Sequence, residues 1–130
     1  MPKQSIILTE DDAPLRELMV EGLTDAGYDV VPLATMALTR THLLAAPSAV
    51  LLLDSPPTGH ALGWLLDFVG RDDAPRTVIV SGSPVAKALG ARFGVNVVMK
   101  PFVMADLVCA IEVASASQSR ARDSTPGVAA

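Results

Sequence analysis

Five short apolar runs recur along the chain, and in the stretch that follows each run the apolar residues are spaced as in a helix. The runs cover residues 5–9, 28–31, 49–54, 77–80 and 95–99. Short apolar runs bounded by turn residues are typical of strands buried on both faces of a parallel sheet. The pattern therefore predicts five strands.

Helix signals follow each strand. Asp12 and Pro14 open the first helix and Gly27 ends it, while Thr35 caps a second helix that reaches about residue 46. The third, fourth and fifth helices are predicted from apolar stripes, the fourth being short. Their inward residues are Leu62, Leu65, Leu66 and Val69, then Val85, Leu89 and Phe93, then Met104, Leu107, Ala110, Ile111 and Ala114.

Strand and helix alternate five times, which favours an α/β domain with helices on both faces of a doubly wound parallel sheet. The order of the strands does not follow from one sequence. From residue 117 the Ser, Ala, Arg, Pro and Gly composition predicts a disordered tail. We therefore expect one domain over residues 1–116 and a tail over 117–130.

Composition narrows the class of protein. The 130 residues carry a net charge of −4 without a Lys/Arg cluster, so nucleic acid is not an expected partner. The single cysteine, Cys109, fits a reducing compartment, and we expect it to be a small buried residue on the last helix. Without a signal segment or an apolar run of membrane-spanning length, the sequence predicts a cytoplasmic protein with no membrane partner.

Charged and hydroxyl residues that could act chemically stand where the predicted strands end. Asp54 ends the third run, Glu10 and Asp11 follow the first, Ser81 follows the fourth and Lys100 follows the fifth. Ligands of open α/β sheets bind at the carboxyl ends of the strands, so these side chains should converge. The expected result is an acidic, metal-seeking pocket around one aspartate, and we interpret Asp54 as a phosphoacceptor.

These motifs, in this order, resemble the receiver domain of two-component response regulators over residues 4–114. The resemblance implies a flavodoxin-like fold with a five-stranded parallel sheet and five helices on its two faces. It also implies a bound Mg²⁺. Asp11 and Asp54 would bind the ion directly, Glu10 through water, and Pro56 through its backbone carbonyl, since Mg²⁺ prefers hard oxygen ligands and retains waters.

The remaining roles also come from the resemblance. Lys100 would place a positive charge on the transferred phosphoryl group, Ser81 would donate its hydroxyl to it, and the Lys100-Pro101 peptide bond would be cis. The donor would be a bacterial sensor histidine kinase or a histidine phosphotransferase. The chain itself would not be an enzyme, and it would signal through altered contacts with a downstream protein.

Two departures leave an alternative open. Val97 stands where the family usually has an aromatic switch residue, and the interval from Ser81 to Lys100 is about three residues shorter than usual. The chain thus resembles atypical stand-alone, single-domain receivers with a short fourth helix. The alternative is a pseudo-receiver that binds proteins without phosphorylation. Val97 and the Pro56-Pro57 pair favour it, and the retained pocket residues oppose it.

Enzyme classes fit the sequence poorly. A P-loop is absent, and Pro56 stands where a haloacid-dehalogenase-like phosphatase needs its second aspartate. On the predicted third helix, Trp64 and Phe68 are four residues apart, opposite the inward stripe. Such a pair indicates either core packing in a rotated helix or a contact surface for a homodimer or another partner.

Overall fold

The computed structural model describes residues 4–45, 50–54, 77–82, 84, 87–88 and 95–123, with side chains left out at 44 and 117–123. Five strands form one sheet in the order β2-β1-β3-β4-β5, and each neighbouring pair is parallel. The predicted parallel sheet is confirmed, and β3 is its central strand. The bounds are β1 (Ser5–Thr9), β2 (Asp29–Leu33), β3 (Val50–Asp54), β4 (Thr77–Ser81) and β5 (Asn96–Met99).

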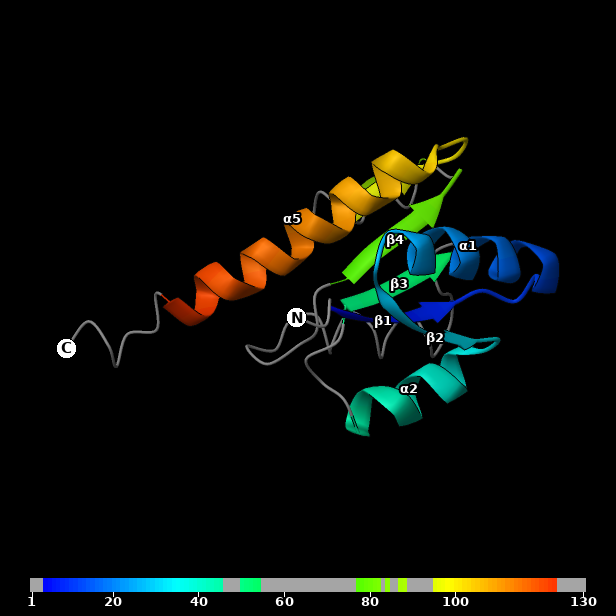
Figure 1. Ribbon diagram of the computed structural model, residues 1–130, viewed down its shortest axis with the longest axis horizontal. Coiled ribbons are helices and arrows are strands. Elements are labelled where there is room, and N and C mark those ends of the chain that lie inside the picture. Colours follow the sequence, from blue (N-terminus) through cyan, green and yellow to red (C-terminus); the bar gives the residue numbers. More distant parts are fainter. Residues whose placement is uncertain are drawn as a thin grey trace.

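Helices cover both faces of this sheet, as Figure 1 shows: α1 (Ala13–Asp25) and α5 (Met104–Asp123) lie on one side and α2 (Met36–Ala45) on the other. Alternate strand residues feed the two cores. Leu8 and Leu52 pack with the α1 and α5 stripes, whereas Ile7 and Leu51 pack with Leu43 of α2. This two-sided burial explains why the strands read as continuous apolar runs.

Local signals set the helix ends as predicted. The Asp12 carboxylate accepts a hydrogen bond from the Leu15 N–H at 3.0 Å, and the Thr35 hydroxyl accepts one from the Leu38 N–H at 3.2 Å. Gly27 follows α1 with φ of 98°, a conformation that costs little only for glycine. Both N-caps and the glycine stop are confirmed.

Element lengths differ at two places. β2 continues to Leu33 through Pro32, which a sheet tolerates because β2 is an edge strand. α5 reaches Asp123, so the helix continues seven residues past the expected boundary at residue 116. Ala, Gln and Arg are good helix formers, and no Pro or Gly interrupts this stretch.

One burial prediction is wrong, and one leucine of α1 is exposed. Cys109 is exposed, because it faces away from the side of α5 that packs on the sheet. Leu18 adjoins the buried Met19 on α1, yet 64% of it is exposed. The predicted third helix, with Trp64 and Phe68, lies outside the described residues, as does most of the fourth. Among the described helices, none has the length and apolar character needed to cross a membrane.

Candidate functional site

The carboxyl ends of the strands bring the predicted site residues to one edge of the sheet. Pairing aligns Thr9 with Leu53 and Ser81 with Met99, so β1, β3, β4 and β5 end at similar levels. Asp54 is the last residue of the central strand β3. It therefore lies between the acid loop that follows β1, here defined as residues 10–12, and the ends of β4 and β5.

Asp54 and Lys100 form an ion pair at this edge of the sheet. The Lys100 Nζ lies 2.6 Å from the Asp54 Oδ1, with 35% of the lysine side chain and 2% of the aspartate side chain exposed. The Lys100 N–H donates to the Ser81 carbonyl at 3.0 Å, and the Lys100-Pro101 bond is cis as expected. A buried carboxylate thus faces a cation whose backbone is tied to the neighbouring strand.

Glu10 is buried although it follows the strand, with only 4% exposed. Its Oε1 accepts a hydrogen bond from the Asp12 N–H at 2.9 Å, whereas its Oε2 is buried and accepts none from the described residues. A buried carboxylate oxygen without a donor requires a partner from elsewhere, such as a cation or water. Asp11, the next residue, is exposed at the surface of the same loop.

These residues fit Mg²⁺ chemically. No set of three Asp, Glu, His or Cys side chains within the described ranges is arranged to hold a metal ion by itself. Mg²⁺ does not need such a set, because it is usually bound through one or two carboxylates and keeps several waters. The Glu10 Oε2, with Asp11 beside it, supplies the hard oxygen chemistry. Pro56, the predicted carbonyl ligand, lies outside the described residues.

Ser81, Gly82 and Val97 complete the edge. Ser81 is buried at the end of β4, next to the exposed Gly82. A Cβ on Gly82 would lie 3.8 Å from the Lys100 Cβ, which is an ordinary contact, so packing alone does not require glycine there. Val97 is half-buried and packs against the α2-side core. A small aliphatic side chain therefore occupies the position at which the family resemblance implies an aromatic one.

Sequence reasoning missed Arg16. The Arg16 Nη1 donates to the backbone carbonyl of Glu10 at 2.7 Å, and the Arg16 N–H donates to the Asp12 carbonyl at 2.8 Å. A lone arginine in the first turns of a helix usually points to solvent, so the sequence pattern did not indicate this contact with Glu10. Its spacing of four residues from Asp12 was the only usable signal, since that spacing places both on one side of the helix.

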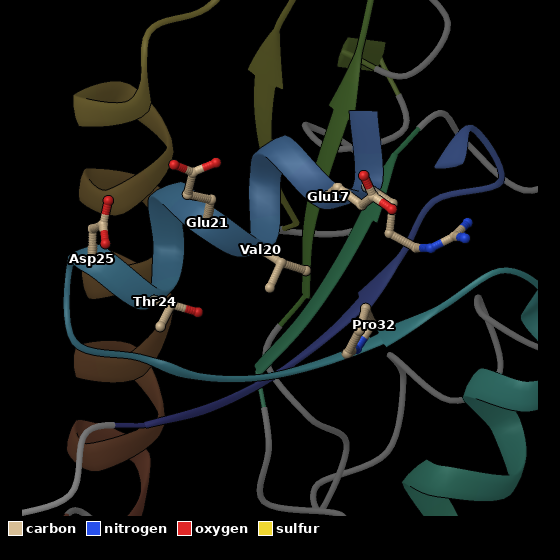
Figure 2. Close-up of a pocket in the computed structure, with 7 residues that line it drawn as sticks. Glu17, Val20, Glu21, Thr24, Asp25 and Pro32 are labelled. Carbon is tan, nitrogen blue, oxygen red and sulfur yellow. The ribbon is translucent and has the colours of Figure 1, made fainter. Parts of the chain in front are cut away.

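A groove lies between α1 and the edge strand β2, with a volume of about 530 Å³. Figure 2 shows Val20 and Thr24 projecting from α1 toward the strand that carries Pro32, with Glu21 and Asp25 turned to the other side. Arg16 also lines the groove, and its side chain contacts the acid loop through the Glu10 carbonyl.

Comparisons with known proteins agree with this architecture. No protein-family model matches the chain. Among curated proteins, the transcriptional regulatory protein VxrB of Vibrio cholerae is 30% identical over 123 residues, which make up 93% of this chain and 50% of VxrB. The chain thus spans half the length of this curated relative.

Solved structures share the fold at low identity. The chemotaxis response regulator CheY4 of Vibrio cholerae has a TM-score of 0.70 at 19% identity, over 85% of this chain and 98% of CheY4. The signal receiver domain of an HD domain-containing protein from Pseudomonas fluorescens has a TM-score of 0.77 at 14% identity, over 95% of each chain. At these identities the likeness is one of fold.

Proposed function

This chain has the fold of a response regulator receiver domain, and from that premise we propose that Asp54 accepts a phosphoryl group. The donor is a phosphohistidine of a sensor histidine kinase or of a histidine phosphotransferase. An Asp54 carboxylate oxygen bonds to phosphorus while the phosphorus–nitrogen bond of the donor breaks. The histidine nitrogen keeps the bonding electron pair and takes up a proton, and Asp54 becomes an acyl phosphate.

One observation carries the proposal, the buried Asp54 carboxylate held 2.6 Å from Lys100 at the end of the central strand. A phosphoryl group carries negative charge that repels a carboxylate nucleophile, so transfer requires positive charge at that point. Lys100 supplies a fixed positive charge, and its backbone hydrogen bond to Ser81 keeps it at the neighbouring strand end. Ser81, buried beside it, would donate its hydroxyl to the bound phosphoryl group.

The acid loop would hold Mg²⁺ with Asp54. Glu10 and Asp11 would act on one side and Asp54 on the other, with the Pro56 carbonyl as the further ligand that the family resemblance implies. When bound, Mg²⁺ supplies charge neutralisation of the phosphoryl oxygens. The buried Glu10 Oε2 supports this role, because it accepts no hydrogen bond from the residues that the structure describes.

The signal would be passed on through altered contacts with a target protein. A target can respond only if it binds the two states of the chain with different affinity. Val97 supports the second candidate function, a module that binds its partner without phosphorylation, because the usual aromatic switch side chain is missing. Both candidates place the chain in protein–protein signalling, and phosphorylation distinguishes them.

Mass spectrometry of the intact protein tests the proposal. Wild type, Asp54→Ala and the control Asp29→Ala are incubated with a small phosphodonor, with Mg²⁺ or with a chelator. Asp29 is an exposed acid at the amino end of the edge strand β2, whereas the site lies at the carboxyl ends of the strands. We expect one phosphoryl group on wild type and on Asp29→Ala, only with Mg²⁺. Equal labelling of Asp54→Ala would contradict the site, and absence of labelling in wild type would favour the phosphorylation-independent module.

A further inference from the structure

The acid loop is fixed mainly through Glu10. The Glu10 N–H donates to the Leu33 carbonyl of β2 at 3.0 Å, and the Glu10 Oε1 accepts from the Asp12 N–H at 2.9 Å. The Glu10 carbonyl accepts from the Arg16 guanidinium at 2.7 Å. Of these three bonds, only the last comes from a side chain outside the loop, so Arg16 is the contact that a substitution can remove without altering an acid.

Arg16 is itself held at the start of α1. Its backbone N–H donates to the Asp12 carbonyl, and its half-buried side chain folds back over the first helical turn to reach Glu10. The contacts form a short ring through Glu10, Asp12 and Arg16. Asp11 lies inside this ring in sequence, so the ring limits where its exposed carboxylate can lie.

The chemistry of the bond matters. Arg16 donates to a backbone carbonyl and not to a carboxylate, so this contact occupies no acid oxygen of the loop. A guanidinium is always charged and directs its donors from a rigid plane, which suits it to hold a carbonyl in one direction. The same positive charge lies near the loop and repels Mg²⁺, so its two effects on metal binding have opposite signs.

We propose that Arg16 is a positioning residue for the metal loop: its bond to the Glu10 carbonyl holds Glu10 and Asp11 in the geometry that binds Mg²⁺. This inference rests on the proposed function for its biological use. It can be judged separately, because it concerns metal binding and loop order. Loss of a residue that orients metal ligands commonly lowers affinity by about tenfold or more.

Calorimetric titration with Mg²⁺ measures the effect directly, on wild type, Arg16→Ala, Arg16→Lys and the control Arg40→Ala. Arg40 is exposed on α2, so its removal changes net charge by the same amount without touching the loop. We expect Arg16→Ala to bind Mg²⁺ about tenfold more weakly, Arg16→Lys to recover part of the affinity, and Arg40→Ala to match wild type. In the metal-free protein, amide hydrogen exchange over residues 10–12 should be faster in Arg16→Ala.

The sign of the change decides the inference. If the Arg16 charge matters more than its bond, removing it tightens Mg²⁺ binding, and tighter or unchanged binding overturns the proposal. Unchanged amide exchange over residues 10–12 overturns it as well. A wild type that binds no Mg²⁺ overturns both this inference and the metal-dependent function. A wild type that binds Mg²⁺ without accepting phosphate overturns the function alone, and the Arg16 comparison still stands.

Discussion

Removal of the Lys100 charge is predicted to have opposite effects on stability and on metal affinity. Lys100→Ala leaves the Asp54 carboxylate, 2% exposed, without the ammonium group that lies 2.6 Å away. It also removes a cation from the edge of the sheet where Mg²⁺ would bind. The main-chain bond from Lys100 to Ser81 does not involve the side chain, so we expect the fold to remain intact.

The magnitude follows from burial. A hydrogen bond to a charged group contributes about 1.5–3 kcal/mol net, and the 35% exposure of the Lys100 side chain reduces this through solvent screening. We therefore expect the metal-free protein to lose about 1–2 kcal/mol of unfolding free energy. Mg²⁺ would then meet no competing ammonium at Asp54. In wild type, Mg²⁺ has to compete with the ion pair for Asp54. If most of the free energy of that pair no longer opposes binding, the Mg²⁺ affinity rises by up to about tenfold, since 1.4 kcal/mol is a factor of ten.

Two assays check this prediction. Urea unfolding with and without Mg²⁺ gives the stability change, and calorimetry gives the metal affinity, with Lys87→Ala, an exposed lysine, as the charge-matched control. Phosphorylation of Lys100→Ala should be weaker even at saturating Mg²⁺. Clearly weaker Mg²⁺ binding by Lys100→Ala would refute the electrostatic reasoning. The contrast with Arg16→Ala is informative, because both variants lose one positive charge and the predicted changes in affinity have opposite signs.

Two further predictions concern the fold. Burial, and next the Glu112 charge, raise the pKa of Tyr28 above its ordinary 10.0, so the unfolding free energy should fall as pH rises above 10.0. Tyr28→Phe should reduce that decline in pH-dependent unfolding, and an identical decline would contradict the assignment. The buried Thr39 hydroxyl bonds to the Thr9 hydroxyl, so Thr39→Val should cost about 1–3 kcal/mol in urea unfolding. The exposed Thr41→Val on the same helix is the control, and equal losses would argue against a specific role for the buried bond.

Strands and helix caps could be predicted from sequence because they depend on local signals. Apolar runs mark strands buried on both faces, and Asp12 and Thr35 cap helices through bonds to residues three positions away. The strand order could not be predicted, because it depends on pairing between residues far apart in the chain. The convergence of the candidate site residues could be predicted only because parallel strands bring their carboxyl ends together.

Burial on the flanks of helices was harder to predict. Leu18 adjoins the buried Met19 in sequence, and the apolar spacing alone does not show how wide the buried stripe of α1 is. Cys109 is different, because two residues rotate a helix by roughly 200°, which turns Cys109 away from the buried Leu107. The Arg16 contact escaped prediction because the direction of a long, flexible side chain is set by tertiary structure.

The central claim is that Asp54 carries the phosphoryl group, and chemical mapping of the modified residue tests it most directly. Borohydride reduces an aspartyl phosphate to homoserine, which peptide fragmentation locates in the chain. After treatment with a phosphodonor and Mg²⁺, the account predicts homoserine at position 54 alone, and none when Mg²⁺ is chelated. Homoserine at Asp11 or Asp12, or at no position in a protein that binds Mg²⁺, would contradict it.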